Sequence, residues 1–390
     1  MEYFQTFLDG IGLVKMTIAD AVMLLVSLVL MYLAIVKKCE PFLLVPLSFG
    51  MMIANIPLAG LDAYAAPGPH VPGEPEPIGG LLYYLYQGMK LSIWPPLIFL
   101  CLGAMTDFGP LIARPGSVFI GVGGQLGIFT AFGLALLLNS MFPELGFTPG
   151  VAASIGIIGS SDGPTTIYTV VRLAPDMLAP VAIAAYSYMA LVPIIQPPIM
   201  RLLTTKKERV IVMPTPKDVS KAKRIIFPIA MTLGTLLLVP AAGPLIAMLM
   251  LGNLIKEAGV VDRFLPTLQK PLLNIFTILI GISVGATAIG ERFLQPTTLI
   301  IICLGLLAFG FGTAGGVLMA KLLNVISGGK VNPLIGNSGV SAMPMAARVS
   351  QKLGQEYNPQ NHLMMHAMGP IVASTLGSAL VAGVFITIFR

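Results

Sequence analysis

Two short polar segments interrupt otherwise apolar stretches of this sequence, and they carry the side chains best suited to chemistry. The first runs from Gly159 to Thr166 and the second from Gly336 to Pro344. Each combines helix-breaking residues with side chains that bear oxygen. Backbone that leaves a helix within hydrocarbon has to be buried in protein or line a cavity, because lipid offers it no hydrogen-bond partner. Paired segments of this kind are typical of a transport site between two structural repeats.

The oxygen atoms of both segments suit a hard monovalent cation such as Na⁺, which prefers carboxylate, hydroxyl, amide and carbonyl ligands. Asp162 is the only carboxylate placed centrally in either segment. A carboxylate at membrane depth is costly, so we expect Asp162 to be functional. The segment also fits an ordinary helix start, with Ser161 or Asp162 as N-cap and Pro164 in the first turn, and the two interpretations are compatible. The other candidate oxygen ligands are Ser160, Ser161, Thr165, Thr166, Asn332, Asn337, Ser338 and Ser341.

Three further side chains could take part in binding or catalysis. Arg348 follows the second segment, where its guanidinium would suit an anionic carboxylate. An anchoring role at the membrane surface is an equal alternative for this arginine. Tyr186 and Tyr188 lie within an apolar stretch and need hydrogen-bond partners for their hydroxyl groups. A structural role is the usual one for such tyrosines, and a relay of protons is the functional alternative.

The composition predicts an integral membrane protein. Of the 390 residues, 56% are hydrophobic and 10% are charged, whereas about 25% are charged in a typical soluble domain. Residues 21–36, 116–138 and 297–320 are among the long stretches with little or no charge. The net charge of +6 does not indicate nucleic-acid binding, because the basic residues lie mostly between apolar segments, as the positive-inside rule requires. The three cysteines and three histidines form no recognisable disulfide or metal pattern.

The chain also contains a weak internal duplication. Pro46 with Asn55 nine residues later matches Pro244 with Asn253 at the same spacing. Further along, Leu-Gly-Ala-Met-Thr resembles Val-Gly-Ala-Thr, and Ile-Gly-Ser-Ser resembles Ile-Gly-Asn-Ser, in the same order. The matches predict two membrane repeats and a basic cytoplasmic linker between them, with boundaries at 1–203, 204–224 and 225–390.

The distribution of charge orients these repeats. Lys37, Lys38 and the basic linker 204–224 should be cytoplasmic, whereas the loop 59–80 has acidic residues and no lysine or arginine and should lie outside. We expect an all-α polytopic membrane protein of two inverted repeats with about ten transmembrane helices. The two polar segments would be re-entrant or broken helices that enter from opposite faces and meet near the midplane.

The polar segments and their surroundings resemble a known family. They read Ile-Gly-Ser-Ser-Asp-Gly-Pro-Thr and Asn-Pro-Leu-Ile-Gly-Asn-Ser-Gly-Val-Ser-Ala-Met-Pro-Met-Ala-Ala-Arg-Val, and His-Ala-Met-Gly-Pro follows near the end of the chain. This pattern is similar to the membrane beta subunit of the biotin-dependent sodium-pumping decarboxylases. The oxaloacetate, methylmalonyl-CoA and glutaconyl-CoA decarboxylases share that subunit. The resemblance extends over nearly the whole chain, and the long second motif is specific.

The resemblance implies a subunit that decarboxylates carboxybiotin and couples this reaction to Na⁺ export with proton uptake. It implies a carboxyltransferase alpha subunit, a biotin carrier subunit that presents carboxybiotin, and a small single-span membrane subunit as partners. It also implies homo-oligomers within a complex in the inner (plasma) membrane. Biotin itself is not expected on this chain, because the sequence contains no Met-Lys-Met.

The resemblance further assigns an ion site. Asp162 and Ser341 would bind Na⁺ and exchange protons. Ser161 and Asn337, which the oxygen chemistry of the two segments suggests, complete the expected set of metal ligands. One departure concerns Ile371, which follows Met-Gly-Pro where the family commonly has an asparagine. The isoleucine removes a possible ion ligand, so the Na⁺ stoichiometry stays open.

By the same resemblance, catalytic roles fall on Asp162, Tyr188 and Arg348, with Tyr188 assisting the transfer of ions or protons. Asn332, Gly336 and Arg348 would lie toward the carboxybiotin pocket or support the second segment. The substrate that the complex decarboxylates is chosen by another subunit and does not follow from this sequence.

A passive transporter is the main alternative. A secondary Na⁺/H⁺ antiporter or a Na⁺-coupled organic-anion transporter would also contain inverted repeats and broken segments. The specific second motif favours the decarboxylase subunit. A membrane scaffold without catalysis would leave the position of Asp162 unexplained.

Overall fold

The computed structural model describes residues 3, 10–38, 40–61, 63–64, 79–214, 218–343 and 345–390. Most of the acidic loop 59–80, and Pro344 at the end of the second polar segment, lie outside these residues. All regular elements in the described part of the chain are helices, as the sequence predicts. The helices of the first half are α2 (Ile18–Ile35), α3 (Pro41–Ala54), α4 (Leu81–Lys90), α5 (Trp94–Met105), α6 (Gly109–Ala113), α7 (Ser117–Gly124), α8 (Leu126–Met141), α9 (Pro149–Gly156), α10 (Gly163–Leu173) and α11 (Leu178–Leu203).

The second half follows a short helix in the basic linker, and a π-helical turn precedes one of its long helices. These elements are α12 (Lys206–Arg209), α13 (Lys221–Leu238), α14 (Gly243–Ala258), α15 (Leu265–Thr267), the π-turn η7 (Leu268–Leu272), α16 (Leu273–Thr287), α17 (Gly290–Phe293), α18 (Pro296–Ile326), α19 (Met345–Tyr357) and α20 (Met364–Phe389).

Length and composition make six helical stretches of the described chain suitable for crossing a membrane, or up to eight if each of two bent pairs counts as one span. One bent pair joins α4 and α5 at 68°, and the other bends within 175–203 at 64°. Proline explains the second bend, because Pro193 and its neighbours Pro197 and Pro198 lack the N–H that a helix interior needs. The chain is therefore a helical membrane protein.

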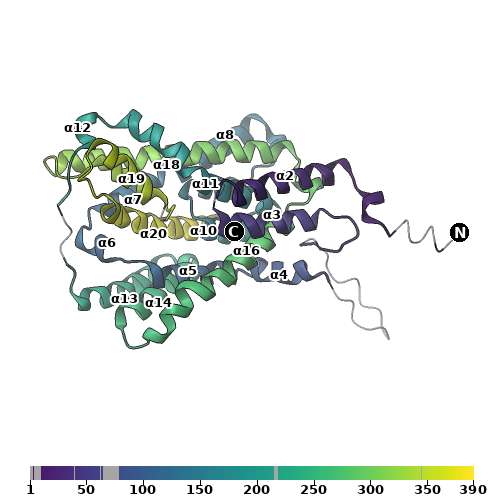
Figure 1. Ribbon diagram of the computed structural model, residues 1–390, viewed down its shortest axis with the longest axis horizontal. Helices are drawn as coiled ribbons and strands as arrows, with labels where there is room; N and C mark the ends of the chain where they lie inside the picture. The colour runs from purple at the N-terminus through teal and green to yellow at the C-terminus, as the bar shows by residue number, and fades with distance from the viewer. Residues whose placement is uncertain are drawn as a thin grey trace.

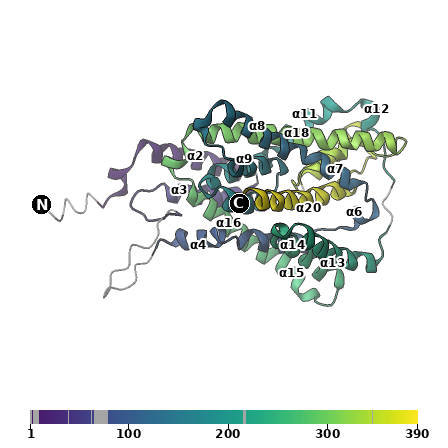
Figure 2. The same ribbon diagram turned by 180° about the vertical axis from the view of Figure 1, so that it is seen from behind.

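The helices form three layers, visible from both sides of the molecule (Figures 1 and 2). Helices α8 and α18 run along one side, α10 and α20 lie in the middle, and α5, α13 and α14 lie on the other side. The middle layer holds the first polar segment, and Ser160, Ser161 and Asp162 of this segment are buried.

Several helix pairs pack through glycine, among them α5 with α14 and α3 with α16. In the pair formed by α5 and α14, a Cβ added at Gly103 would lie 1.9 Å from the Leu249 carbonyl oxygen, and one at Gly252 would lie 2.0 Å from that of Leu100. Helices α3 and α16 make the same kind of contact through Gly50 and Gly285. Small residues let helix backbones approach closely, which is a main source of helix association in membranes.

The asparagines of the sequence duplication join these helix pairs at their ends. Asn55, just after α3, donates from Nδ2 to the Ala288 carbonyl at 2.8 Å, and its Oδ1 accepts from the Gly290 N–H at 2.9 Å. Asn253 of α14 donates from Nδ2 to the Thr106 carbonyl, just after α5, at 3.2 Å. Each asparagine therefore binds a carbonyl group that a helix end leaves without an intrahelical partner.

Replacing Asn55 by leucine should destabilise the fold, because it leaves both the Ala288 carbonyl and the Gly290 N–H without their partner. We expect a loss of about 1 kcal/mol, the size of interhelical hydrogen bonds in membrane proteins, seen as a lower thermal unfolding midpoint in detergent. Ser140→Ala, which removes only a local hydrogen bond of an exposed residue, is the control. A midpoint for Asn55→Leu equal to that of the control would contradict the role of this contact.

Candidate functional site

The two polar segments meet in the structure. In the first, the short 3-10 helix η3 (Ile157–Ser160) precedes α10, and in the second, the 3-10 helix η8 (Pro333–Gly339) precedes α19. The Ser341 N–H donates to the Ser160 carbonyl oxygen at 2.8 Å, so the two breaks touch through their main chains. Residues from the two halves of the sequence therefore share one site.

The Asp162 carboxylate is buried at this contact and has only neutral hydrogen-bond partners in the described chain. As the N-cap of α10, it accepts from the Thr165 N–H at 3.3 Å through Oδ1, while Oδ2 accepts from the Thr165 hydroxyl at 2.8 Å. The Ser378 hydroxyl of α20 also donates to Oδ2, at 3.1 Å. A buried carboxylate without a positive partner is unfavourable, so Asp162 requires a bound cation or a proton.

Ser161 supplies a hydroxyl beside this carboxylate. Its Oγ is buried and has no hydrogen-bond partner among the described residues. The residue also adopts a left-handed conformation, with φ of 54°, which is uncommon for a residue other than glycine. By contrast, the Ser160 hydroxyl donates to the Ile157 carbonyl at 2.8 Å and is thus engaged within its own turn. Of the two neighbouring serines, Ser161 is the one available to a ligand.

Helix α20 contributes polar groups that the sequence interpretation missed. Ser378 contacts Asp162, and Ser374, one turn earlier, accepts a hydrogen bond from the Ser341 hydroxyl at 3.1 Å. The Gln125 side-chain amide also donates to the Ser374 hydroxyl, at 3.2 Å, and the Gln125 Oε1 atom is buried without a partner in the described chain. Two serines four residues apart on an apolar helix were the available signal, because this spacing places them on one face.

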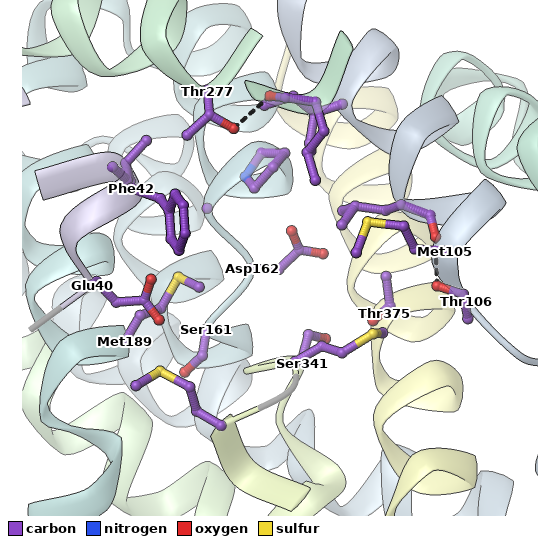
Figure 3. Close-up of a pocket in the computed structure, with 18 of the residues that line it drawn as sticks. Glu40, Phe42, Met105, Thr106, Ser161, Asp162, Met189, Thr277, Ser341 and Thr375 are labelled. Carbon is purple, nitrogen blue, oxygen red and sulfur yellow. Dashed lines mark hydrogen bonds between the residues drawn. The ribbon is translucent and has the colours of Figure 1, made fainter. Parts of the chain in front are cut away.

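A cavity of about 660 Å³ opens beside Asp162 (Figure 3). It lies between helices α3, α5 and α16 on one side and α10, α11, α19 and α20 on the other. Asp162, Ser161, Ser341 and Arg348 all line it, and so does Tyr186. The charged groups on its described walls are Lys38, Glu40, Asp162, Lys270 and Arg348.

Tyr188, Gly336 and Asn337 are not among the described residues that line the cavity. The Tyr188 hydroxyl donates to the Ile302 carbonyl of α18. A Cβ at Gly336 would lie 2.4 Å from the Val317 Cα atom, so this glycine permits η8 to pack on α18. Asn337 donates to the Gln196 Oε1 atom of α11 at 2.7 Å, and thereby ties the second segment to the first half.

Asn332 also lies away from the described cavity walls, and it holds the linker that follows α11. Its Nδ2 donates to the carbonyls of Arg209 and Ile211 at 3.1 and 2.8 Å, and its Oδ1 accepts from the Leu334 N–H at 3.0 Å. Asn361 donates to the Arg209 carbonyl as well, at 3.0 Å. Asn332 therefore joins the start of the second segment to the linker through hydrogen bonds.

Ile371 is fully buried one turn before the serines of α20. Its carbonyl accepts a hydrogen bond from the Thr375 hydroxyl at 3.0 Å, and Thr375 lines the cavity. The isoleucine side chain offers no oxygen, so hydroxyl groups are the polar side chains that α20 presents near Asp162.

Replacing Asn332 by aspartate should loosen the linker, because a carboxylate would face two carbonyl oxygens that now accept hydrogen bonds. We expect a destabilisation of about 1 to 3 kcal/mol and faster tryptic cleavage at the lysines and arginines of 204–224. Thermal unfolding and timed proteolysis in detergent measure both effects. Gln360→Ala, at an exposed position, is the control, and cleavage of Asn332→Asp at the wild-type rate would be evidence against this role.

Comparison with known proteins identifies the family of this chain. A family model described as "Na+-transporting oxaloacetate decarboxylase beta subunit" matches residues 19–389. The chain is 52% identical to the methylmalonyl-CoA decarboxylase subunit beta of Propionigenium modestum, over 100% of both chains. It is 48% identical to oxaloacetate decarboxylase beta chain 2 of Salmonella typhi, over 99% of both chains. It is 50% identical to the glutaconyl-CoA decarboxylase subunit beta of Acidaminococcus fermentans, over 95% of this chain and 94% of that one. The chain therefore belongs to the beta-subunit family of the Na⁺-transporting, biotin-dependent decarboxylases.

Proposed function

We propose that this subunit decarboxylates carboxybiotin in the cavity beside Asp162 and uses the reaction to drive Na⁺ export with proton uptake. The observation that carries the proposal is that Asp162 and Arg348 line one cavity. One of these groups suits a cation and the other a carboxylate. A single compartment thus provides for both the transported ion and the reacting group.

Arg348 is the group proposed to bind the carboxylate. Its guanidinium has no ion-pair partner in the described chain, and Lys38 and Lys270 add positive charge to the same cavity. A guanidinium presents two parallel N–H groups that match a carboxylate. Carboxybiotin supplies a carbon–nitrogen bond that releases CO₂ when the nitrogen takes up a proton.

Asp162 is the group proposed to alternate between Na⁺ and a proton. Its neutral partners leave the charge uncompensated, and the hydroxyls of Ser161 and Ser341 line the same cavity. These oxygens suit a Na⁺ ion. Moving one such ion against 100 mV costs about 2.3 kcal/mol. If ion and proton exclude each other at Asp162, proton delivery depends on movement of the ion.

The proposed architecture is two inverted repeats, 1–203 and 225–390, joined by the linker 204–224, with about ten spans. The reciprocal contacts of Asn55 and Asn253 support it, because equivalent asparagines bind helix ends in the opposite half. The apolar helices Pro41–Ala54 and Pro149–Ser160 are shorter than the six long spans. In this arrangement the polar segments enter from opposite faces and meet at the Ser341–Ser160 hydrogen bond.

The proposed complex contains an alpha carboxyltransferase, a biotin carrier and a small single-span subunit, with several copies of this chain, in the inner membrane. The relatives are named as subunits of decarboxylases, which supports a multisubunit assembly. A secondary Na⁺/H⁺ antiporter or Na⁺-coupled organic-anion transporter is the alternative, and it would move Na⁺ without responding to carboxybiotin.

Asp162→Asn should abolish Na⁺-dependent decarboxylation, because the amide keeps the shape of the side chain but carries no charge for the ion. The loss expected from removing one partner of a buried charge is about two orders of magnitude or more. The measurement is CO₂ release from free carboxybiotin by the chain in liposomes, with and without Na⁺, together with Na⁺ movement. Asp176→Asn, at an exposed position, is the control. Full coupling in Asp162→Asn would defeat the assignment.

Ser378→Ala should weaken Na⁺ activation without abolishing turnover. The substitution removes a hydroxyl that contacts the Asp162 Oδ2 atom at 3.1 Å, and a hydrogen bond to a charged group is worth roughly tenfold in affinity. We expect the Na⁺ concentration for half-maximal decarboxylation to rise by about that factor. Thr387→Ser, far along the same helix, is the control. An unchanged Na⁺ dependence in Ser378→Ala would separate this residue from the ion site.

A further inference from the structure

Glu40 is an acidic residue in the cavity for which the proposed reaction has no role. It lies just before α3 and lines the same space as Asp162 and Arg348. Figure 3 shows the Glu40 carboxylate directed into the open space beside Asp162. Within the described chain, no ion pair or hydrogen bond of this carboxylate is found, although the side chain is partly buried. A carboxylate in this position is available to a cation or to a positively charged side chain.

The local backbone does not explain why an acidic residue occurs at position 40. It is the N-cap of α3, but its side chain makes no capping hydrogen bond, which is the usual reason for an acidic residue there. The residue adopts a left-handed conformation with φ of 40°, and nearby Lys38 does the same with φ of 55°. Three of the five described residues with this conformation other than glycine, Lys38, Glu40 and Ser161, line the cavity. Backbone strain of this kind tends to gather at functional sites.

Glu40 and Arg348 line the same cavity, so the charge of each acts on the other. Partial burial raises the pKa of the Glu40 carboxyl group, and the positive charge of Arg348 opposes that shift. The two groups do not form a direct ion pair in this conformation of the described chain. Arg348 is exposed toward solvent, so its guanidinium has room to turn toward either a ligand or Glu40.

We propose that Glu40 is the counter-ion of Arg348 across the cavity: its charge offsets that of the guanidinium through space when no carboxylate ligand is bound, and an entering carboxylate takes over this role. The inference rests on the proposed function in taking carboxybiotin as that ligand. Carboxybiotin carries a negative charge that decarboxylated biotin lacks. Glu40 therefore competes with the substrate for Arg348 and takes the place of the lost carboxylate after the reaction.

This competition also gives the cavity selectivity. Arg348, Lys38 and Lys270 attract any small anion. The negative charge of Glu40 repels every anion, and an anion that binds the guanidinium weakly cannot overcome this repulsion. Only a ligand with additional contacts in the cavity can take over the role of Glu40 toward Arg348. Without Glu40, the guanidinium would bind common carboxylates such as acetate more tightly and would be inhibited by them.

Glu40→Gln tests the proposal, because the amide has the size of the native side chain and no charge. In the complex reconstituted in vesicles, we expect the KM for free carboxybiotin and the inhibition constant of acetate to fall by about twofold to fivefold, the range of one partly exposed charge pair. The maximal rate should stay close to that of the wild type. Glu40→Asp, which keeps the charge, should behave like the wild type, and Glu144→Gln, on an exposed loop, is a matched control.

A second measurement does not depend on turnover. Phenylglyoxal modifies arginine, and mass spectrometry can follow its addition to Arg348. Acetate should protect Arg348 at lower concentration in Glu40→Gln than in the wild type. If the wild type fails to decarboxylate carboxybiotin, the proposed function fails, while this protection experiment still decides the pairing of Glu40 with Arg348.

Several results would overturn the proposal. One is an unchanged or higher KM and acetate constant in Glu40→Gln. Another is an equal effect of Glu40→Gln when Arg348 is already replaced by glutamine, since a counter-ion acts only through its partner. A change in Na⁺ dependence alone would assign Glu40 to the ion instead. If Glu40→Gln does not fold, Glu40→Ala supplies a second neutral variant for the same measurements.

Discussion

The structure depends on holding one carboxylate, that of Asp162, inside a membrane protein without a positive side chain beside it. Its partners are an N–H group and two hydroxyls. These hydrogen bonds replace part of the water that a charged carboxylate loses on burial, but they do not neutralise its charge. The site is therefore complete only with a cation or a proton, which is the property that a coupled ion pump needs.

The surrounding fold keeps this group away from lipid. Broken backbone in hydrocarbon needs partners, and the two breaks satisfy part of that need from each other through the Ser341–Ser160 hydrogen bond. Glycine also lets α7 approach the second break closely, since a Cβ at Gly124 would lie 1.7 Å from the Gly339 carbonyl oxygen. Asn332 and Asn337 fix the second break to the linker and to α11. Residues outside the cavity thus determine where its walls stand.

The cavity combines the proposed cation site with groups suited to an anion. Three basic side chains and two carboxylates line its described walls, so it holds charges of both signs. An anionic ligand beside Arg348 and a cation beside Asp162 would attract each other across a space of low polarity. This attraction gives a physical route by which loss of the anion weakens the hold on the cation.

The amino-acid sequence by itself determined the membrane class, the helical fold and the two polar breaks, because these follow from local hydrophobicity and helix-breaking residues. Asp162, Ser161, Ser341 and Arg348 were identifiable for the same reason, and the structure brings all four to one cavity. Only the tertiary structure decided which remote groups join them. Ser374 and Ser378 lie on a helix remote in sequence, and Glu40 lies in a loop with no motif around it. Tyr186 lines the cavity while Tyr188 points to α18. The two tyrosines lie on different faces of the same helix, and the packing of that helix against the others decides which face meets the cavity.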